Sequence, residues 1–426
     1  MKRRGVLIGL GALAAGGWLL RPDNRGAAHD RYFQQLNDTL KNAGPGRPLM
    51  LIDRQRLADN CRTLMSMIPS GCNFRIVAKS LPSVPLIQEV MTHTGSQRVM
   101  LFHQPFMNAL ADAEPGCDML LGKPMPIQAA RQFYQELGEA HRFDPSQQLQ
   151  WLIDSLPRLE QYLTLARELD QPMRINVEID VGLHRGGLGD PSQLDALLAL
   201  IHANPRHLQF SGFMGYDAHV GKLPGFIESA EEGHRHTERR YQSFIDRLYQ
   251  QAPQYQTQPL CFNGAGSPTL ALYDDSTVVN ELSAGSCLVK ASDFDLPSLD
   301  AFAPAVFIAA PVIKAMDGLN LPGPIPLGDA WQRWDPNRQR TYFIYGGYWK
   351  AQPVSPAGIQ ANGVYGVSTN QMMYNGSPET ALTPDDQIFF RPTQSEFVML
   401  QFGDLAVWED QAIRQWWPPL PQGEGA

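Results

Sequence analysis

Short apolar runs alternate with longer segments of helical period from residue 48 onward, and this alternation constrains the fold more than any other feature. The predicted strands are Leu49–Ile52, Phe74–Ala78, Arg98–Phe102, Asp118–Leu121, Leu149–Ile153, Arg174–Ile179, Leu208–Met214, Leu260–Asn263 and Thr277–Glu281. Strands separated by helices pair in parallel through right-handed crossovers. The sequence therefore predicts an α/β fold, a (β/α)₈ TIM-type barrel with one strand to spare.

The segments between these strands carry apolar residues at helical spacing, and many follow an Asp, Ser or Pro that can start a helix. The predicted helices are Arg54–Ile68, Val84–Thr94, Ile127–Leu137, Leu156–Glu168, Pro191–Ala203 and Glu228–Tyr249. Their regular placement assigns residues 29–300 to the barrel domain.

The pattern changes after about residue 300, where prolines cluster and long amphipathic segments end. The β-rich runs there are Thr341–Tyr345, Gln387–Phe390 and Phe397–Leu400. Such short runs between turn residues predict a mainly antiparallel β domain over residues 301–417. The Pro- and Gly-rich residues 418–426 are expected to form a disordered tail.

The amino terminus resembles an export signal. Lys2-Arg3-Arg4 precedes an apolar run over Gly5–Leu20, which is shorter than the roughly 20 residues of a membrane-spanning helix. Paired arginines before a mildly apolar run are typical of the twin-arginine route, which predicts a periplasmic protein. The alternative is an uncleaved anchor that associates the protein with the inner membrane, and in either case residues 1–28 lie outside the fold.

Charge and cysteine content exclude several functions. The chain has 35 Lys and Arg residues against 43 Asp and Glu residues, a net charge of −8, so it lacks the basic surface that nucleic-acid binding requires. Its five cysteines include no Cys-x-x-Cys pair, which argues against a disulfide framework, a structural zinc site and dithiol redox chemistry.

Lys79 is the most informative single residue. It follows the apolar run Phe74–Ala78, and catalytic groups of TIM-type barrels lie at the carboxyl ends of the strands. A lysine in that position can form a Schiff base with an aldehyde cofactor. The alternative is an ordinary lysine that reaches solvent at the end of a strand, and position alone favours this alternative.

Three further segments place chemically active residues at the same predicted rim. They are residues 176–187, with acids, a histidine and an arginine on a Gly-rich turn, residues 212–219, with Tyr216 and His219, and residues 263–269, a loop of small residues. Backbone N–H groups and hydroxyls of such a loop can bind a phosphate. Each segment is weak evidence by itself, and their shared rim is what favours a functional site.

At these residues the sequence resembles the fold-type III pyridoxal-phosphate (PLP) enzymes, the alanine-racemase-like barrels, and among them the D-threonine aldolase and D-serine dehydratase branch. The resemblance runs from about Leu49 to Asp295. It implies that Lys79 binds the cofactor covalently, that Arg185 lies near the pyridine nitrogen and that Tyr216 contacts the cofactor.

The resemblance also implies the remaining contacts to the cofactor. Gly264, Gly266 and Ser267 are expected to hold the phosphate, Ser286 belongs to a late Gly-Ser motif, and His219 is expected beside the cofactor. In this family the first strand pairs with the carboxyl-terminal β domain. The run at residues 49–52 is therefore the one of the nine predicted strands that the barrel does not need.

The chain departs from the branch where that branch binds a divalent metal through a His and a Cys or Asp in the β domain. The corresponding stretch is residues 391–396, with only Glu396 as a hard-cation ligand, and the last histidine of the chain is His236. We therefore expect no divalent metal. His234 and His236 point about 200° apart on a helix and cannot easily share a metal ion.

The resemblance implies a PLP-dependent enzyme that acts on a small amino acid of D configuration. It also implies a homodimer. Retro-aldol cleavage, as in D-threonine aldolase, is the first prediction. Dehydration with deamination and racemisation are the alternatives within the family. A protein that binds PLP without turnover is the alternative of another class, and the missing metal ligands favour it slightly.

Overall fold

The computed structural model describes residues 21–138, 142–222, 224, 226–320, 327–364 and 366–423. These residues form two compact units. The barrel unit comprises Arg54–Ala305, Gln394–Gln401 and the described residues from Trp417 onward, and the β unit comprises the described residues up to Asp53, Val306–Thr393 and Phe402–Trp416. Residues 1–20, with the paired arginines and the apolar run of the expected export signal, lie outside the described residues. Residues 21–28 were expected outside the fold, but they contact the β unit: Ala27 forms a β-bridge with Ala357, and the Arg25 N–H donates to Oδ1 of Asn337 at 2.8 Å.

The barrel unit contains a closed ring of eight parallel strands, which confirms the predicted (β/α)₈ fold. The strands, in ring order, are β2 (Asn73–Val77), β3 (Arg98–Leu101), β4 (Asp118–Leu121), β5 (Leu149–Ile153), β6 (Met173–Glu178), β7 (Leu208–Met214), β8 (Cys261–Gly264) and β9 (Glu281–Ala284). Most of their residues are buried, as expected for strands covered on the outside by helices.

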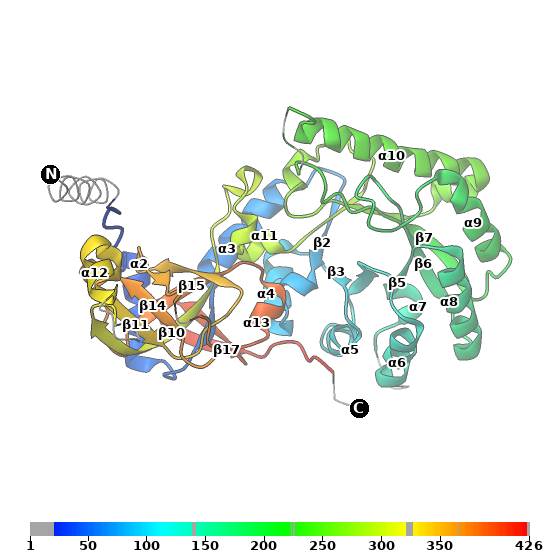
Figure 1. Cartoon of the computed structure of the whole chain (residues 1–426). Coiled ribbons are helices and arrows are strands. Elements are labelled where there is room, and N and C mark those ends of the chain that lie inside the picture. The colour runs from blue at the N-terminus through cyan, green and yellow to red at the C-terminus, as the bar shows by residue number, and fades with distance from the viewer. Residues whose placement is uncertain are drawn as a thin grey trace. The chain divides into compact units, whose positions relative to one another are not determined.

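Helices connect the barrel strands, except for one that precedes the first strand and two that follow the last. They are α3 (Arg54–Ser66), α4 (Val84–Thr94), α5 (Gln104–Ala113), α6 (Ile127–Leu137), α7 (Pro145–Gln148), α8 (Leu156–Leu169), α9 (Leu194–His202), α10 (Ala230–Gln251), α11 (Ser286–Val289) and α13 (Glu396–Met399). Figure 1 shows α8, α9 and α10 outside strands β5 to β7. Ser229 starts α10 with a capping box to Glu232.

The last barrel strand differs from the sequence prediction. Thr277–Glu281 was the predicted strand, whereas β9 begins at Glu281. The Glu238 carboxylate accepts hydrogen bonds from the Thr277 hydroxyl at 2.8 Å and the Val278 N–H at 2.9 Å. Because these groups bond to a helix side chain, the β-branched segment remains a loop, and ladder pairing with β2 begins at Glu281.

A buried ion cluster joins the two strands that close the ring. Arg75 of β2 donates to Glu281 of β9 at 2.5 and 2.9 Å and to the Asp118 carboxylate at 2.5 Å, with its side chain fully buried. Burial disfavours a charged carboxyl, yet Arg75 holds the pKa of Glu281 below its usual value. The ionised pair therefore stabilises the folded barrel above the ordinary carboxyl pKa, and this contribution is lost as the pH falls below it.

The β unit is built on one sheet that is mainly antiparallel. Its strands are β1 (Leu49–Asp53), β10 (Val306–Asp317), β11 (Arg340–Ile344), β12 (Ala351–Ser355), β13 (Gln360–Ala361), β14 (Met373–Gly376), β15 (Gln387–Pro392), β16 (Leu405–Glu409) and β17 (Ala412–Trp417). Helices α2 (Arg31–Ala43) and α12 (Leu327–Trp334) belong to the same unit. Strand β1 pairs antiparallel with β10 and parallel with β16, which accounts for the spare apolar run.

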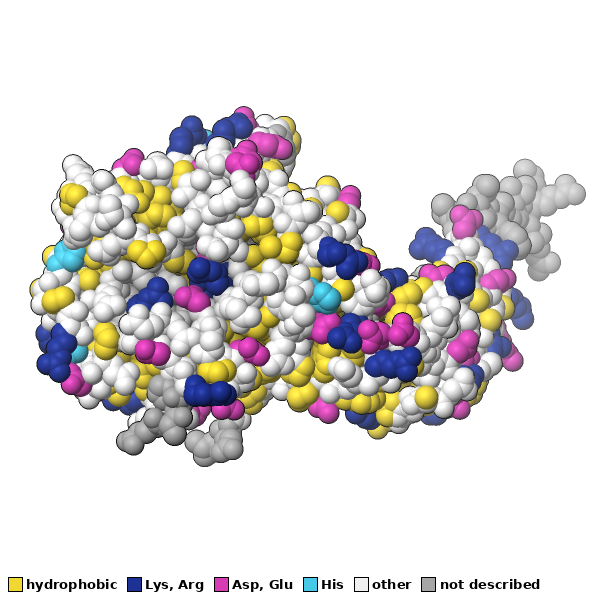
Figure 2. Space-filling view, turned by 180° about the vertical axis from the view of Figure 1, so that it is seen from behind, with side chains coloured by type: hydrophobic (Ala, Val, Ile, Leu, Met, Phe, Trp, Pro, Cys, Tyr) yellow, Lys and Arg dark blue, Asp and Glu magenta, His cyan; other side chains and the backbone are white. Residues whose placement is uncertain are grey.

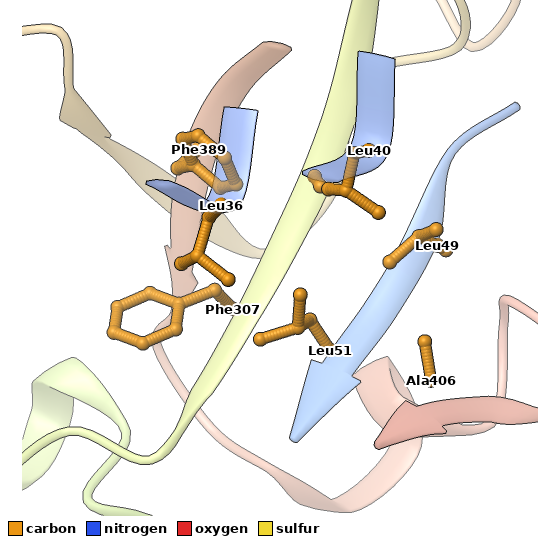
Figure 3. Close-up of a cluster of buried hydrophobic side chains, with 8 residues drawn as sticks. Leu36, Leu40, Leu49, Leu51, Phe307, Phe389 and Ala406 are labelled. Atoms are coloured by element: carbon orange, nitrogen blue, oxygen red, sulfur yellow. The ribbon is translucent and has the colours of Figure 1, made fainter. Parts of the chain in front are cut away.

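Residues 29–48, expected within the barrel domain, belong instead to the β unit. Figure 3 shows the reason: Leu36 and Leu40 of α2 point toward Leu51, Phe307 and Phe389 of the sheet. Leu36 and Leu40 lie one helical turn apart, so both face the sheet. The strand–helix alternation in the sequence begins at residue 48, so it did not predict α2.

On the face drawn in Figure 2, Lys and Arg side chains are interspersed with Asp and Glu side chains. No helix among the described residues is both long enough and apolar enough to cross a membrane.

The ion cluster at the ring closure yields a test of stability. Arg75→Met leaves the Glu281 carboxylate buried without its main partner, so we expect a loss of about 3–5 kcal/mol in the free energy of unfolding. Urea denaturation at neutral pH measures this loss. The double variant Arg75→Met/Glu281→Leu removes both charges and should recover most of it, and a loss below about 1 kcal/mol in the single variant would contradict the proposed importance of the pair.

Candidate functional site

A cavity of about 690 Å³ lies at the carboxyl ends of the barrel strands. Residues that end or follow all eight strands line it, namely Val77, Lys79, Ser80, Met100, Phe102, His103, Phe106, Gly122, Lys123, Pro124, Asp154, Glu178, Arg185, Gly186, Met214, Tyr216, Asn263, Ala265, Gly266, Ser267, Pro268, Ser283, Ala284, Gly285, Ser286 and Phe294. Glu396, Phe397, Leu400 and Gln422 complete the lining. This is the end of the barrel where TIM-type enzymes carry their active sites.

Lys79 lies in a short 3₁₀ turn, Ala78–Ser80, directly after β2. Its ammonium group is 3.0 Å from Oε1 of Glu396 and 5.0 Å from the centre of the Phe102 ring. The side chain is 38% exposed, so it is accessible from the cavity while the carboxylate and the ring hold its position. The lysine is therefore not simply directed into solvent.

Glu396 is a site residue that the sequence reading did not assign to Lys79. The run Phe397–Leu400 was predicted as a strand, and this prediction was wrong because residues 396–399 form α13. A four-residue apolar run cannot distinguish a strand from one helical turn. The ion pair to Lys79 joins residues far apart in the chain, and no local pattern indicates it.

The loop of residues 263–269 contributes Gly266 and Ser267 to the cavity wall. The Ser267 hydroxyl accepts hydrogen bonds from the N–H groups of Cys287 at 3.1 Å and Gly285 at 3.4 Å, which ties the loop to the start of α11. A Cβ atom on Gly266 would lie 2.7 Å from the Tyr216 ring, so only glycine allows this close approach. The neighbouring Ser286 hydroxyl lies 2.9 Å from that of Ser80, so small polar groups from three segments meet here.

Asp217 positions this loop through two hydroxyl groups. Its buried carboxylate accepts hydrogen bonds from Thr269 at 2.8 Å and Tyr273 at 2.9 Å. These hydroxyls in turn accept the N–H groups of Gly266 at 3.1 Å and Ala265 at 3.0 Å. Burial raises the pKa of Asp217, whereas the two hydroxyl donors oppose the shift. The network holds Ala265 at a φ of +66°, a conformation that non-glycine residues rarely adopt.

Arg185 and Tyr216 lie together on the wall. The guanidinium carbon of Arg185 is 5.0 Å from the centre of the Tyr216 ring, within the range of a cation–π contact. Glu178, at the end of β6, also lines the cavity, and burial raises its pKa while the charge of Arg185 opposes that rise. The wall thus carries a cation, an aromatic ring and a carboxyl group.

Two predicted site residues lie outside the cavity lining. Gly264 is the last residue of β8, behind the lining residues Ala265 and Gly266. His219 packs against Gly182, where a Cβ atom would lie 2.7 Å from Nε2 of the His219 ring. Burial lowers the pKa of His219. His219 is not among the residues that line the cavity, and its role beside the cofactor stays a prediction.

In the part of the chain that the structure describes, no group of three or more His, Cys, Asp or Glu residues could hold a metal ion. The Nδ1 atom of His236 is 2.7 Å from Glu228, whereas the ring of His234 packs against Tyr273. All five cysteines are free thiols.

The end of the chain reaches the cavity, although we expected residues 418–426 to be disordered. Leu420 is buried, and its N–H donates to the Pro82 carbonyl at 2.8 Å. Gln422 lines the cavity, with its carbonyl oxygen 3.4 Å from Nε2 of His103. Proline and glycine content suggested disorder, but the burial of Leu420 supplies an apolar anchor that fixes this segment.

This anchor predicts that the end of the chain shields Lys79. Deletion of residues 419–426 should increase the rate at which trinitrobenzenesulfonate modifies Lys79, because Gln422 is removed from the wall of the same cavity. Peptide mass mapping measures the rate, and Lys314 in the β unit is the internal control. Leu420→Ser, which keeps the length of the chain, should have a smaller effect in the same direction. Equal rates at Lys79 in all three proteins would show that the segment does not shield it.

Comparisons with known proteins agree with this architecture. A D-threonine aldolase from Filomicrobium marinum is similar with a TM-score of 0.65 and 16% identity, over 88% of this chain and 96% of that one. A D-threo-3-hydroxyaspartate dehydratase from Delftia sp. HT23 is similar with a TM-score of 0.67 and 16% identity, over 90% and 99%. An alanine racemase from Bacillus anthracis is similar with a TM-score of 0.66 and 11% identity, over 87% and 97%.

These likenesses at low identity establish the fold. A comparison with curated protein sequences finds no match. The model of the alanine racemase N-terminal domain family matches residues 52–293, which is more than half of the chain. The chain therefore belongs to the alanine racemase N-terminal domain family, whose members are PLP-dependent enzymes of fold type III.

Proposed function

We propose that this protein is a PLP-dependent lyase that cleaves a small β-hydroxy D-amino acid by a retro-aldol reaction. The observation that carries the proposal is the position of Lys79, which lies in the cavity at the carboxyl ends of the strands and is held by Glu396 and Phe102. The choice of reaction rests on the resemblance of the sequence to the D-threonine aldolase branch, because the aldolase and the dehydratase are equally similar in structure.

The residues of the cavity fit PLP by their chemistry. Lys79 would bind the aldehyde carbon, and the small polar groups of Gly266, Ser267 and Ser286 would hold the phosphate. Arg185 and Tyr216 would contact the ring. A side chain at Gly266 would collide with the Tyr216 ring, so the loop can pack against Tyr216 only with glycine at this position. When bound, PLP supplies an electron sink for bonds at the substrate Cα.

The protein itself must position these groups and restrict access of water. Asp217 fixes the N–H groups of Gly266 and Ala265 through two hydroxyls, so the loop is ordered before any ligand binds. Apolar side chains such as Met100, Phe106 and Met214 limit water in the cavity. The 690 Å³ volume lies in the range of cofactor pockets, so it suits a cofactor with a small substrate.

Dehydration and racemisation use the same cofactor and differ in the bond that breaks, so products decide between these activities and the proposed one. A D-amino-acid screen that follows aldehyde, ammonia and stereochemistry distinguishes all three. Release of ammonia without aldehyde would favour the dehydratase, and loss of optical activity alone would favour the racemase. A protein that binds PLP but turns over no amino acid would match the non-catalytic alternative.

We propose that the reaction needs no divalent metal. The carboxylate that could have served a hard cation, Glu396, forms its ion pair with Lys79 instead. A homodimer, implied by the family resemblance, is also proposed, and its mass in solution tests it.

Lys79→Ala should abolish the visible absorption band of the bound cofactor and the activity together. One side chain that is 38% exposed contributes little to the core, so the fold should remain intact by circular dichroism. Lys123→Ala is the matched control, because Lys123 lines the same cavity and should leave the visible band in place. A visible band that persists in Lys79→Ala would show that another group binds the cofactor.

We also propose that the protein is exported by the twin-arginine route. A PLP enzyme acquires its cofactor where the cofactor is made, and a route for folded proteins explains the pair Arg3-Arg4 before a weakly apolar run.

Replacement of Arg3 and Arg4 by lysine should therefore retain the protein in the cytoplasm with its cofactor bound. Cell fractionation and the visible band of the retained protein measure both parts of this expectation. Export of the Lys-Lys variant at the normal level would instead indicate the general secretion route or a membrane anchor, and would remove the argument from cofactor loading.

A further inference from the structure

We infer that Glu396 is the catalytic base that takes the proton from the substrate β-hydroxyl, so that the cleavage proceeds without a metal ion. The inference rests on the proposed retro-aldol function and adds the residue that performs its proton transfer. It starts from one contact, the 3.0 Å distance between Glu396 Oε1 and Lys79 Nζ.

The position of Glu396 is fixed by the packing of α13. Val398 and Met399 are buried, and the Met399 N–H donates to the Ser395 carbonyl at 3.1 Å. Phe397, directly before them, is 73% exposed, so the turn presents one face to the protein and keeps the other open. A carboxylate on such an anchored turn is held in place without being sealed from the cavity, and it is 34% exposed.

Glu396 also lies near a second group that faces the cofactor. Burial is the main cause that raises the pKa of Tyr216, and the negative charges of Asp217 and Glu396 add to it. The charge of Glu396 therefore acts on the region between Lys79 and Tyr216, which is where the reacting end of a substrate must lie.

Two other carboxyl groups line the cavity, but neither is paired with Lys79 in the described structure. Glu178 interacts with the charge of Arg185. Asp154 accepts a hydrogen bond from the Ser155 hydroxyl at 3.1 Å. Among the carboxylates of the described cavity lining, Glu396 is the one that an ion pair places on Lys79.

The reach of Glu396 follows from the chemistry of the lysine. With PLP bound, the substrate amine would take the place of Lys79 Nζ, so a group within hydrogen-bond distance of Nζ would lie near the substrate nitrogen. The β-hydroxyl oxygen is three bonds from that nitrogen, and rotation about the Cα–Cβ bond can bring it to the same side. A general base must lie within this reach of the proton that it removes.

The hydroxyl proton passes to the Glu396 carboxylate, and the O–H electron pair forms the C=O bond of the departing aldehyde. The Cα–Cβ bond breaks, and bound PLP would supply the electron sink for its electron pair. The proton then passes from the Glu396 carboxyl group to Cα by way of the amine of Lys79, which the substrate has released. The products are an aldehyde and a shortened amino acid, and Glu396 is again a carboxylate.

A substrate without a β-hydroxyl does not need this base. Removal of the Cα proton from D-alanine, followed as exchange with deuterium in D₂O, uses the same cofactor and the same lysine. The two reactions together therefore separate a role in the hydroxyl step from a role in building the site.

The test compares Glu396→Gln with the wild-type holoenzyme. We expect cleavage of D-threonine to fall by about 10²–10⁴-fold in kcat, the usual contribution of general base catalysis. Deuterium exchange into D-alanine should fall much less than cleavage, because this reaction loses only the contact between Glu396 and Lys79 and no hydroxyl proton has to be removed. The visible band should remain, and borohydride reduction should still add the cofactor mass to Lys79, because the amide keeps the shape of the side chain.

The matched control is Glu168→Gln. Glu168 lies on α8, pairs with Arg131 and does not line the cavity, so this variant should keep both reactions. The wild-type protein is also assayed after EDTA treatment, with and without added Mn²⁺, and its cleavage rate should not change.

The outcomes separate the inference from the function on which it rests. A wild-type protein that binds PLP but cleaves no β-hydroxy D-amino acid overturns the proposed function, and the inference with it. Cleavage by Glu396→Gln at the wild-type rate overturns the inference alone. Loss of the visible band and of deuterium exchange in that variant shows a structural role and also overturns it. Loss of cleavage with EDTA and recovery with Mn²⁺ shows that a metal ion performs the step assigned to Glu396.

Discussion

The buried contact between Arg75 and Glu281 is the interaction on which the rest of the barrel depends. It joins β2 to β9, the first and last strands of the ring, inside a space from which water is largely excluded. Lys79 follows one of these strands, and Ser286 follows the other. The distance between the proposed attachment point of the cofactor and part of its phosphate site is therefore set by the same closure. A buried ion pair gives little net stability but specifies which strands meet.

A second buried carboxylate, Asp217, organises the neighbouring part of the rim, the loop after β8. It acts through Thr269 and Tyr273 on two backbone N–H groups. The strained backbone of Ala265 persists because these bonds over-determine it. The hydrogen bonds from Thr269 and Tyr273 order the loop of residues 263–269 in advance, so this loop would lose little entropy when an anion binds.

The substrate end of the cavity is where this chain departs from the branch it resembles. Glu396 on α13 and Gln422 near the end of the chain both line the cavity, and they come from segments that follow the last barrel strand by more than a hundred residues. The strands of a barrel fix the residues at its rim, whereas the segments that cover the rim vary between proteins of the same fold. The proposed substrate end of the cavity can therefore differ while the proposed cofactor end stays the same.

The sequence by itself determined the barrel, the spare first strand and the placement of Lys79, Arg185, Tyr216, Gly266, Ser267 and Ser286 at one rim. The barrel and the place of Lys79 follow from hydrophobic periodicity and from strand ends, both of which are local, whereas the pairing of the first strand and the choice of Ser286 follow from the family resemblance. The sequence analysis misplaced β9, predicted a strand at α13 and did not predict α2. Only the tertiary structure decided that Glu396 contacts Lys79, that Leu420 anchors the end of the chain and that His219 packs on Gly182. Each of these depends on which side chains can be buried together, and burial is a property of the assembled fold rather than of any window of sequence.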